Sequence, residues 1–404
     1  MRGLADAKEI TIMARLFICS TQFQIISTLC LLNDDKENFS KMDNDVIIES
    51  GLPHGEKWAD ILKQSGYVRH VYLLNKGVNF APLSLSKRIL FTRKLRGKVH
   101  VTWNNWFLIT FNRHQRYLEN EVSNNKDHLN FDSSIYDEFF AGSMTGLGIA
   151  LTKRFAPLKV KIFIYDEGVG SYVGNVWVKR VVPKAIYLFA TDLIDTPYLT
   201  KQIVPLSKLK HSRLLEIVEK SLNITQESMP NFVFFDQWLG MPTVHDSLPY
   251  DGWKTSAYVD KKINLLKRIS ACVGEGQLGV RLHPTSCVSE VFDYYASQQL
   301  ELLRENYGIP FELSVSVAKK RPKVLLTIFS SAVITPLTLG IDQDMKVILL
   351  WKLFIKDQAM KEFTKDNSIT DFFEKIRSKY PNNVYIPETE KALLEILAAT
   401  SADD

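Results

Sequence analysis

Short apolar runs alternate with stretches of helical periodicity along this chain, and that alternation restricts the fold more than any other feature. Runs of strand length lie at 16–19, 46–48, 71–74, 99–102 and 161–165. After the first run, apolar side chains recur at helical spacing in Phe23, Ile26, Leu29 and Cys30. Parallel strands need crossover connections such as helices, so the pattern predicts parallel sheets whose faces are covered by helices.

The same pattern begins again after about residue 200. Strand-length runs lie at 232–235, 278–282, 324–329 and 345–350, and helical stretches cover about 255–274 and 388–399. Pro205 and Met229-Pro230 interrupt the periodicity between the two halves. A chain of 404 residues is also too long for one ordinary core. We therefore expect an α/β fold of two Rossmann-like domains that face one cleft.

The predicted division has four parts. The first core strand begins only after Met13, so a segment at 1–12 is expected to be loosely ordered. The N-terminal domain covers 13–210 and the C-terminal domain covers 225–385. Residues 386–404 form a C-terminal helix and tail.

Composition and charge narrow the class of protein. Apolar residues make up 46% and charged residues 24%, which is normal for a soluble globular chain. A net charge of +5 is small for a dedicated nucleic-acid binder and suits an anionic ligand or an anionic membrane surface. The four cysteines are scattered without a CxxC, which disfavours a zinc site or disulfide framework and favours a reducing cytosol. No run of eighteen apolar residues and no secretion signal is seen, so no membrane-spanning helix is predicted.

Several well-known site motifs are missing from the sequence. There is no GxxxxGK[ST], no well-placed GxGxxG, no HExxH and no clear DxD. A metal-dependent sugar-nucleotide transferase of the DxD type is therefore disfavoured. We expect neither a metal nor a cofactor.

The first of three polar signals is Asp166-Glu167-Gly168, directly after the strand at 161–165. Open α/β sheets place their active sites at such strand ends. Because side chains alternate along a strand, only one of the two carboxylates can face a site directly. Gly168 allows a sharp turn and the close approach of a substrate. A carboxylate here can take a proton from an attacking hydroxyl, although an acidic turn that caps the next segment fits as well.

The second signal ends the predicted strand at 278–282. Arg281 and His283 share one face of that strand, and Pro284 cannot continue its ladder. A histidine at this place can protonate a departing phosphate or stabilise its charge. A capped strand end with a hydrogen-bonded histidine is the alternative.

The third signal, Ser330-Ser331, follows the strand at 324–329. A serine before a helix is a good N-cap. Hydroxyls and backbone N–H groups at a helix start can also bind an anion, and the two interpretations are compatible.

Weaker candidates complete the predicted rim of the site. Glu312 is placed at a strand end, where a carboxylate can accept two hydrogen bonds from a ribose diol. Asp236-Gln237 follows the strand at 232–235 and adds a second candidate base or a substrate contact. The first strand-to-helix turn carries Ser20-Thr21-Gln22, for substrate binding or for capping. The basic, partly amphipathic stretch 87–98 could rest on an anionic membrane or grip a polyanionic glycan, or be a solvated helix.

The sequence resembles the bacterial sialyltransferases, especially glycosyltransferase family 52 (the lipooligosaccharide sialyltransferases) and the related polysialyltransferases of family 38. The likeness rests on YDEGVGSY at 165–172, RLHP at 281–284 and TIFSSA at 327–332, in the family's order and at similar spacing. The opening RLFICSTQFQ also looks like the family's first strand and turn. The resemblance spans about 14–350.

What the resemblance implies is a GT-B fold that transfers sialic acid from CMP without a metal and with inversion at the anomeric carbon. The N-terminal domain would serve the acceptor and the C-terminal domain the CMP-linked donor. An acid of the first signal would be the general base, with Asp166 favoured and Glu167 close behind. Asp236 is a rival, because the base of some family 52 members comes from the matching strand.

The resemblance also assigns the donor side. His283 would act on the leaving CMP phosphate, Ser330 and Ser331 would bind that phosphate, and Glu312 would hold the ribose. Gly168, Ser20-Thr21-Gln22, Gln237, Arg281 and Pro284 complete the predicted substrate-binding set.

The sequence therefore predicts an inverting, metal-independent sialyltransferase that moves a sialic-acid-type nonulosonate from CMP to a hydroxyl of a bacterial lipooligosaccharide or capsule. We expect a cytoplasmic protein, in peripheral contact with an anionic inner membrane through 87–98. Its partners would be a CMP-sugar donor and a glycan acceptor, and no nucleic acid. Alternatives are a transferase for pseudaminic acid, legionaminic acid or Kdo, a UDP-sugar enzyme of the same fold, and an inactive glycan- or nucleotide-binding protein on this scaffold.

Overall fold

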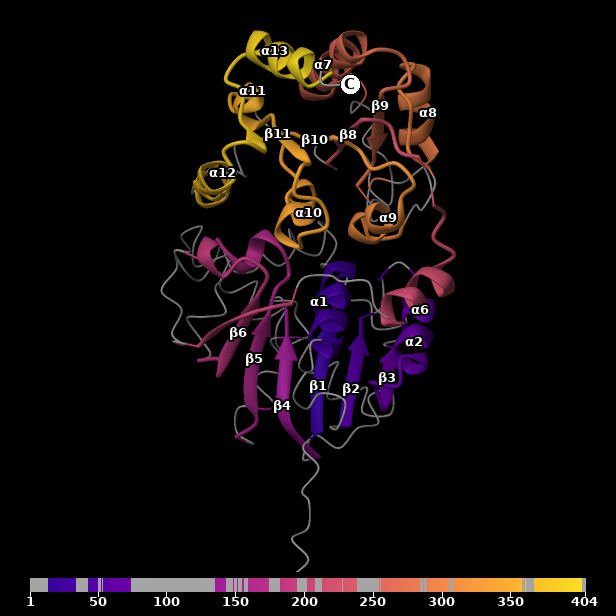
Figure 1. Ribbon diagram of the computed structural model, residues 1–404, viewed down its shortest axis with the longest axis vertical. Coiled ribbons are helices and arrows are strands. Elements are labelled where there is room, and N and C mark those ends of the chain that lie inside the picture. Colours follow the sequence, from indigo (N-terminus) through magenta and orange to yellow (C-terminus); the bar gives the residue numbers. More distant parts are fainter. Residues whose placement is uncertain are drawn as a thin grey trace, which may run out of the picture. The chain divides into compact units, whose positions relative to one another are not determined.

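Two α/β units make up the chain in the computed structural model shown in Figure 1. Unit 1 comprises Met1–Glu167, Asn175–Leu188 and Tyr198–Leu206, and unit 2 comprises Gly168–Gly174, Phe189–Pro197 and Ser207–Asp404. The structure describes residues 14–33, 43–49, 52, 54–73, 135–142, 148, 151, 155, 159–173, 182–194, 202–207, 213–226, 228–237, 254, 256–283, 286, 289–304, 308–357, 360 and 367–401. Each unit has a parallel sheet of its own, and the expected α/β class is confirmed.

Unit 1 is built on a seven-stranded parallel sheet in the order β3-β2-β1-β4-β5-β6-β7. The strands are β1 (Ala14–Cys19), β2 (Asp43–Ile48), β3 (His70–Leu73), β4 (Tyr136–Ala141), β5 (Lys161–Tyr165), β6 (Ala185–Leu188) and β7 (Ile203–Pro205). The predicted strands at 16–19, 46–48, 71–74 and 161–165 are confirmed. The predicted strand at 99–102, like the segment 1–12 and the basic stretch 87–98, lies outside the described residues.

Three strands of unit 1 escape the apolar pattern. β4 begins with acids that are used at the amino edge of the sheet, where Arg15 Nε donates to Glu138 at 2.7 Å and the Ala14 N–H donates to Asp137 at 3.2 Å. β6 has only four residues. β7 is an edge strand that ends in Pro205. Proline has no backbone N–H to donate, and an edge strand tolerates this loss because only one of its sides is paired.

Aromatic side chains fill the centre of this sheet. Phe17 of β1 stacks on Phe140 of β4 with ring centroids 4.5 Å apart, and Phe140 stacks on Phe163 of β5 at 4.6 Å. The helix α1 (Gln22–Asn33) is buried over most of its length, and α2 (Gly55–Gln64) buries Trp58. This packing fixes the carboxyl ends of β1, β4 and β5, where the polar residues of unit 1 lie.

Unit 2 has a five-stranded parallel sheet in the order β12-β11-β10-β8-β9. The strands are β8 (Phe232–Phe235), β9 (Leu278–Arg281), β10 (Val324–Thr327), β11 (Lys346–Leu349) and β12 (Val384–Tyr385). The helices are α6 (Arg213–Leu222), α7 (Ala257–Val273), α8 (Ser289–Ser297), α9 (Phe311–Val317), α10 (Thr335–Thr338), α11 (Trp351–Phe354), α12 (Ser368–Lys379) and α13 (Glu390–Ser401). The strands predicted in this half and the helices predicted at 255–274 and 388–399 are confirmed.

The strand order of unit 2 reverses between β8 and β10. From β8 the chain adds β9 on one side and then returns to place β10, β11 and β12 on the other. Such a reversal opens a crevice at the carboxyl ends of the two inner strands, and ligands of open α/β sheets bind there. In unit 1 the corresponding reversal lies between β1 and β4.

Two short segments from the N-terminal half of the chain belong to unit 2. Tyr172 stacks on Phe372 of α12 with centroids 5.5 Å apart, and its hydroxyl accepts a hydrogen bond from the Ala190 N–H at 3.2 Å. Lys375 of α12 donates to the Leu193 carbonyl at 2.9 Å. The segment that follows Glu167 is therefore anchored in unit 2, while Asp166 and Glu167 stay in unit 1.

Candidate functional site

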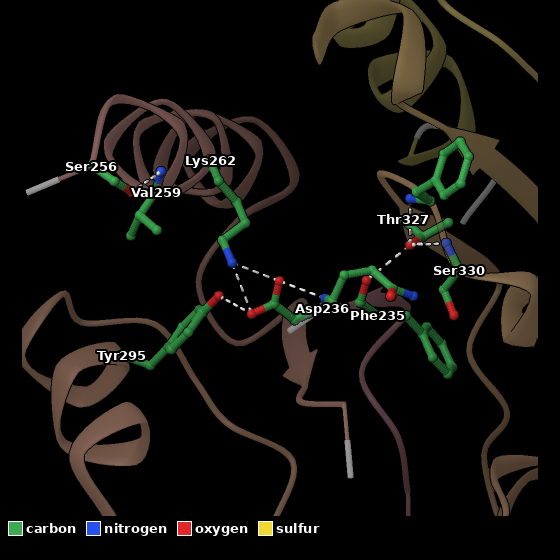
Figure 2. Close-up of polar contacts among 10 residues, drawn as sticks. Phe235, Asp236, Ser256, Val259, Lys262, Tyr295, Thr327 and Ser330 are labelled. Carbon is green, nitrogen blue, oxygen red and sulfur yellow. Dashed lines mark hydrogen bonds and ion pairs between the residues drawn. The ribbon is translucent and has the colours of Figure 1, made fainter. Parts of the chain in front are cut away.

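The turn after β10 is tied to the end of β8 by one threonine (Figure 2). The Thr327 hydroxyl donates to the Phe235 carbonyl at 2.9 Å and accepts from the backbone N–H groups of Phe329 at 3.2 Å and Ser330 at 3.0 Å. β10 therefore ends at Thr327, two residues before the predicted end at 329. The result is a rigid connection at the strand-order reversal of unit 2.

The serine pair begins the next turn, as predicted. Ser330 is the N-cap of the short 3-10 helix η9 (Ser331–Val333), and its hydroxyl accepts from the Ala332 N–H at 3.3 Å. Ser331 is the first residue of η9 and is partly exposed. A Cβ atom at Gly168, which has a φ of 100°, would lie 3.9 Å from the Ser331 hydroxyl oxygen. Gly168 of the first signal is thus a neighbour of the third signal within unit 2.

His283 lies two residues beyond the end of β9 and is partly exposed. Burial lowers the pKa of its imidazole below the usual value, and the negative charge of Asp236 opposes this shift. The imidazole is therefore largely neutral at pH 7, a form in which one ring nitrogen still donates a hydrogen bond. The backbone carbonyl of His283 accepts a hydrogen bond from the Ser286 N–H at 2.8 Å. Pro284 lies outside the described residues.

Glu312 is not at a strand end, in contrast to the prediction. It lies in the first turn of α9, because Pro310 directly before this helix favours a helical start. The carboxylate is buried and lies in hydrogen-bonding distance of the Thr335 hydroxyl. Burial raises the pKa of Glu312, and the Thr335 hydrogen bond and the charge of Arg281 oppose the rise.

Arg281 lies beside this carboxylate at the end of β9. Its guanidinium donates to the Ile309 carbonyl at 2.6 Å and lies over the Phe311 ring, 5.4 Å from the centroid. The contacts hold the loop before α9 against the sheet. Arg281, Glu312, His283 and the serine pair all belong to unit 2, around the ends of β9 and β10.

Asp236, at the end of β8, is enclosed by polar partners (Figure 2). Lys262 of α7 approaches both carboxylate oxygens, at 2.7 and 3.0 Å, and the Tyr295 hydroxyl donates to one of them. The Gln237 N–H donates to the other oxygen at 2.8 Å. Asp236 is 2% exposed and Lys262 is 1% exposed.

These contacts decide what Asp236 can do chemically. Four donor contacts use the acceptor sites that a carboxylate has, and its burial leaves no path for an acceptor hydroxyl. Burial lowers the pKa of Lys262, and the charge of Asp236 and its hydrogen bonds to the lysine oppose that change. Asp236 therefore acts as the counter-ion of a buried lysine in this structure.

The polar residues of unit 1 gather around Gln24, in the first turn of α1. The Ser20 N–H donates to the amide oxygen of Gln24 at 2.6 Å, and the amide nitrogen donates to Glu167 at 3.4 Å. Gln24 is fully buried. The Thr21 hydroxyl accepts from the Gln24 N–H at 3.2 Å and so caps α1, and Gln22 begins this helix.

Asp166 and Glu167 differ in access, as strand alternation requires. Asp166 is 1% exposed, and its carbonyl accepts from the Ser27 hydroxyl at 2.7 Å. Glu167 is partly exposed. Burial raises the pKa of Glu167 to about 8, the charge of Asp166 adds to the rise, and the Gln24 hydrogen bond opposes it. Glu167 is thus the carboxyl group with both access and a proton affinity near neutral pH.

The described residues offer neither a metal centre nor a membrane-spanning helix. Across the described residues, no cluster of three or more histidine, cysteine, aspartate or glutamate side chains is arranged to hold a metal ion. No helix in the described part of the chain is both long and apolar enough to cross a membrane.

Sequence reasoning does not reveal four residues of the site, which are Gln24, Gly142, Lys262 and Tyr295. Lys262 had a usable signal, because it lies on the apolar face of α7, between Val259 and Leu266. A lysine on such a face needs an anionic partner. Gln24 has no comparable signal, since its partners come from three different strand ends.

Comparison with known proteins gives no family model and no curated sequence that matches this chain. Solved structures do match. UDP-GlcNAc 2-epimerase of Methanocaldococcus jannaschii, in complex with UDP-GlcNAc and UDP, is 10% identical with a TM-score of 0.52, covering 96% of this chain and 93% of that one. UGT89C1 of Arabidopsis thaliana, complexed with UDP-L-rhamnose, is 11% identical with a TM-score of 0.50, covering 96% and 90%. At this identity the likeness shows the fold, which is of the GT-B type with two Rossmann-like domains.

The predicted family membership is wrong. The two matched structures named above are a UDP-GlcNAc 2-epimerase and a UDP-sugar glycosyltransferase, not CMP-sialyltransferases, and no family model matches the chain. The physical reason lies in the motifs. DEG, HP and SS are short polar groups at the ends of parallel strands, and open α/β sheets place polar groups there for many different ligands.

Proposed function

We propose that this chain is a glycosyltransferase that uses a nucleotide-sugar donor. The observation that carries the proposal is chemical: each parallel sheet of this GT-B fold ends in polar side chains suited to one half of a sugar transfer. Unit 2 offers hydroxyls beyond the end of β10, an imidazole beyond the end of β9 and a buried glutamate in α9. Unit 1 offers a carboxyl group with a raised pKa at the end of β5.

Unit 2 would bind the nucleotide. A neutral His283 donates a hydrogen bond to a phosphate oxygen, and the hydroxyls of Ser330 and Ser331 donate two more. These donors stabilise negative charge as it develops on the leaving phosphate, without the need for a proton transfer. Glu312 would accept hydrogen bonds from the ribose diol if Thr335 releases one carboxylate oxygen.

Unit 1 would supply the general base, for which we choose Glu167 over Asp166 and Asp236. Glu167 takes the proton of the acceptor hydroxyl, and the acceptor oxygen forms a bond to the anomeric carbon. The bond between that carbon and the phosphate oxygen breaks, and the phosphate leaves with the electron pair. Attack opposite to the leaving group inverts the anomeric carbon.

The donor nucleotide needs a direct test. The matched structures are named with UDP-GlcNAc and UDP-L-rhamnose, which supports a UDP-sugar. A CMP-linked nonulosonate, with a lipooligosaccharide or capsule acceptor, stays a prediction from the sequence, as does the absence of a cofactor. Titration with UDP and CMP by calorimetry separates the two, and turnover with the matching sugar donor and a panel of glycan acceptors completes the test.

The expected result is micromolar to millimolar binding of one pyrimidine nucleotide and release of that nucleotide only when an acceptor is present. Binding without release under any acceptor would contradict the transferase and leave a glycan- or nucleotide-binding protein. His283→Ala is the informative variant, because it should lose nucleotide release while it keeps the fold.

Epimerisation of a UDP-sugar is the second candidate, favoured by the likeness to the archaeal 2-epimerase. This reaction removes a proton from C2 and returns one to the opposite face, and it needs no acceptor. Incubation with UDP-GlcNAc in D2O therefore distinguishes the two functions. Deuterium at C2 of the sugar indicates epimerisation, and its absence together with acceptor-dependent nucleotide release indicates transfer.

A further inference from the structure

Gln24 is a buried polar side chain whose orientation the surrounding structure determines. Its amide oxygen is 2.6 Å from the Ser20 nitrogen, which is a backbone donor and cannot accept. The amide NH2 group must therefore point the other way. In that direction it meets the Glu167 carboxylate at 3.4 Å.

Gly142 completes this arrangement from the end of β4. A Cβ atom at position 142 would lie 2.8 to 2.9 Å from Cγ, Cδ and Nε2 of Gln24, closer than real Cβ contacts. The absence of a side chain at 142 thus makes the room that Gln24 occupies. Gln24 is therefore confined from two sides, at the place where the strand order of unit 1 reverses between β1 and β4.

We propose that Gln24 is a positioning residue for Glu167: its NH2 group, oriented by Ser20 and confined by Gly142, holds the carboxylate in place and favours its charged form. An NH2 group is a donor, so it interacts better with a carboxylate than with the protonated acid. The role in catalysis rests on the proposed function, in which Glu167 is the base. The contact between the Gln24 amide and the Glu167 carboxylate does not depend on that function.

Three described groups around Glu167 do not favour its charged form. Asp166, beside it in the chain, disfavours the charged form. Burial raises the pKa of the Tyr165 phenol, which interacts with Glu167, well above its usual value, and that of the Cys19 thiol, which contacts Tyr165, to about 11. Both are neutral at pH 8. The Gln24 amide is the neighbouring group that opposes burial and Asp166.

Gln24→Met tests the inference, because methionine fills the same space but cannot donate. The chain is labelled with 13C at the glutamate carboxyl carbon, and the Glu167 signal is assigned by its loss in Glu167→Gln. In the unmodified chain we expect a titration midpoint near 8. In Gln24→Met we expect the midpoint to rise by at least about half a pH unit, the direction that loss of a donor requires.

Two further variants keep the inference falsifiable if Gln24→Met does not fold. Gln24→Glu retains an oxygen for the Ser20 N–H but replaces the donor by a second acid, and should raise the midpoint further. Gly142→Ala keeps Gln24 but displaces it, and should raise the midpoint in the same direction. Gln298→Met is the matched control, since this glutamine is a partly exposed residue of unit 2 whose amide oxygen accepts from Lys267 at 2.8 Å.

The result that would overturn the inference is an unchanged Glu167 midpoint in folded Gln24→Met or Gly142→Ala protein. The NMR titration uses no substrate, so it stands apart from the proposed function. A raised Glu167 midpoint with no change in the pH dependence of turnover would support the positioning role of Gln24 and refute Glu167 as the base. An equal shift of the Glu167 midpoint and of the pH–rate profile would support both the positioning role and the base.

Discussion

Glu167 in unit 1 is the second residue beyond the buried strand β5 and Asp236 in unit 2 is the first beyond the buried strand β8, and their partners differ. Glu167 meets a neutral amide and the charge of Asp166, and burial raises its pKa to about 8. Asp236 meets a lysine, a phenol and a backbone N–H, and is 2% exposed. The comparison shows that carboxyl groups at strand ends can differ in access and in partners. A carboxyl group suits the role of a base when it has access and a partner that leaves its proton affinity near neutral.

The largest effect is expected from removing the carboxylate of Glu167. Glu167→Gln keeps the size of the side chain but cannot take a proton, so turnover with donor and acceptor should fall by about 10²- to 10⁴-fold. Nucleotide binding measured by calorimetry should stay within about twofold, because the proposed phosphate site lies in unit 2. Turnover within tenfold of the unmodified chain would remove Glu167 as the base and return attention to Asp166.

Breaking the buried pair of unit 2 should act on stability. Lys262→Met leaves the Asp236 carboxylate buried with its cation removed, and such a loss typically costs about 3–5 kcal/mol. The urea midpoint of unfolding should fall accordingly. The double change Asp236→Leu with Lys262→Met removes both charges and should recover most of the loss. A double variant no more stable than the single one would show that the two residues do not act as a pair.

The pH dependence of turnover tests Glu167 as the base. Glu167 must be deprotonated to act as a base, and its pKa of about 8 lies above the usual value. Turnover should therefore rise with pH through about 8, by roughly tenfold between pH 7 and pH 9. Steady-state rates across this range, with Glu167→Gln as the control that lacks the rise, check the sign. A rate that falls over this range would contradict the assignment.

The sequence anticipates the sheet well and the contacts of the site poorly. β1, β5, β8 and β10 are buried on both faces, so their apolar runs are readable without a structure. β4 is hidden because it starts with acids that pair at the amino edge of the sheet. The polar ends of the strands are readable too, since chain order places them.

The side chains that contact these polar residues come from helices distant in the sequence. Lys262 reaches Asp236 across 26 positions, and Gln24 reaches Glu167 across 143. No local pattern encodes such pairings, so an acidic residue after a strand fits an accessible carboxyl group and a buried counter-ion equally. The family assignment failed for the same reason, because strand-end polar groups are common to folds of this type and do not specify the nucleotide.

The smallest effect is expected from a lysine–carboxylate pair at the surface of unit 2. Lys391 and Glu395 lie one turn apart in α13 at 3.8 Å, with side chains 87% and 67% exposed. Water screens this pair and both side chains stay mobile, so Lys391→Ala should change the free energy of unfolding by at most about 0.5 kcal/mol. The urea midpoint, compared with that of Lys262→Met, measures how far burial alone alters the value of the same two chemical groups. Equal destabilisation of Lys262→Met and Lys391→Ala would show that burial does not explain the contribution of the Asp236–Lys262 pair to stability. The difference between Asp236 and Glu167 would then rest on access alone.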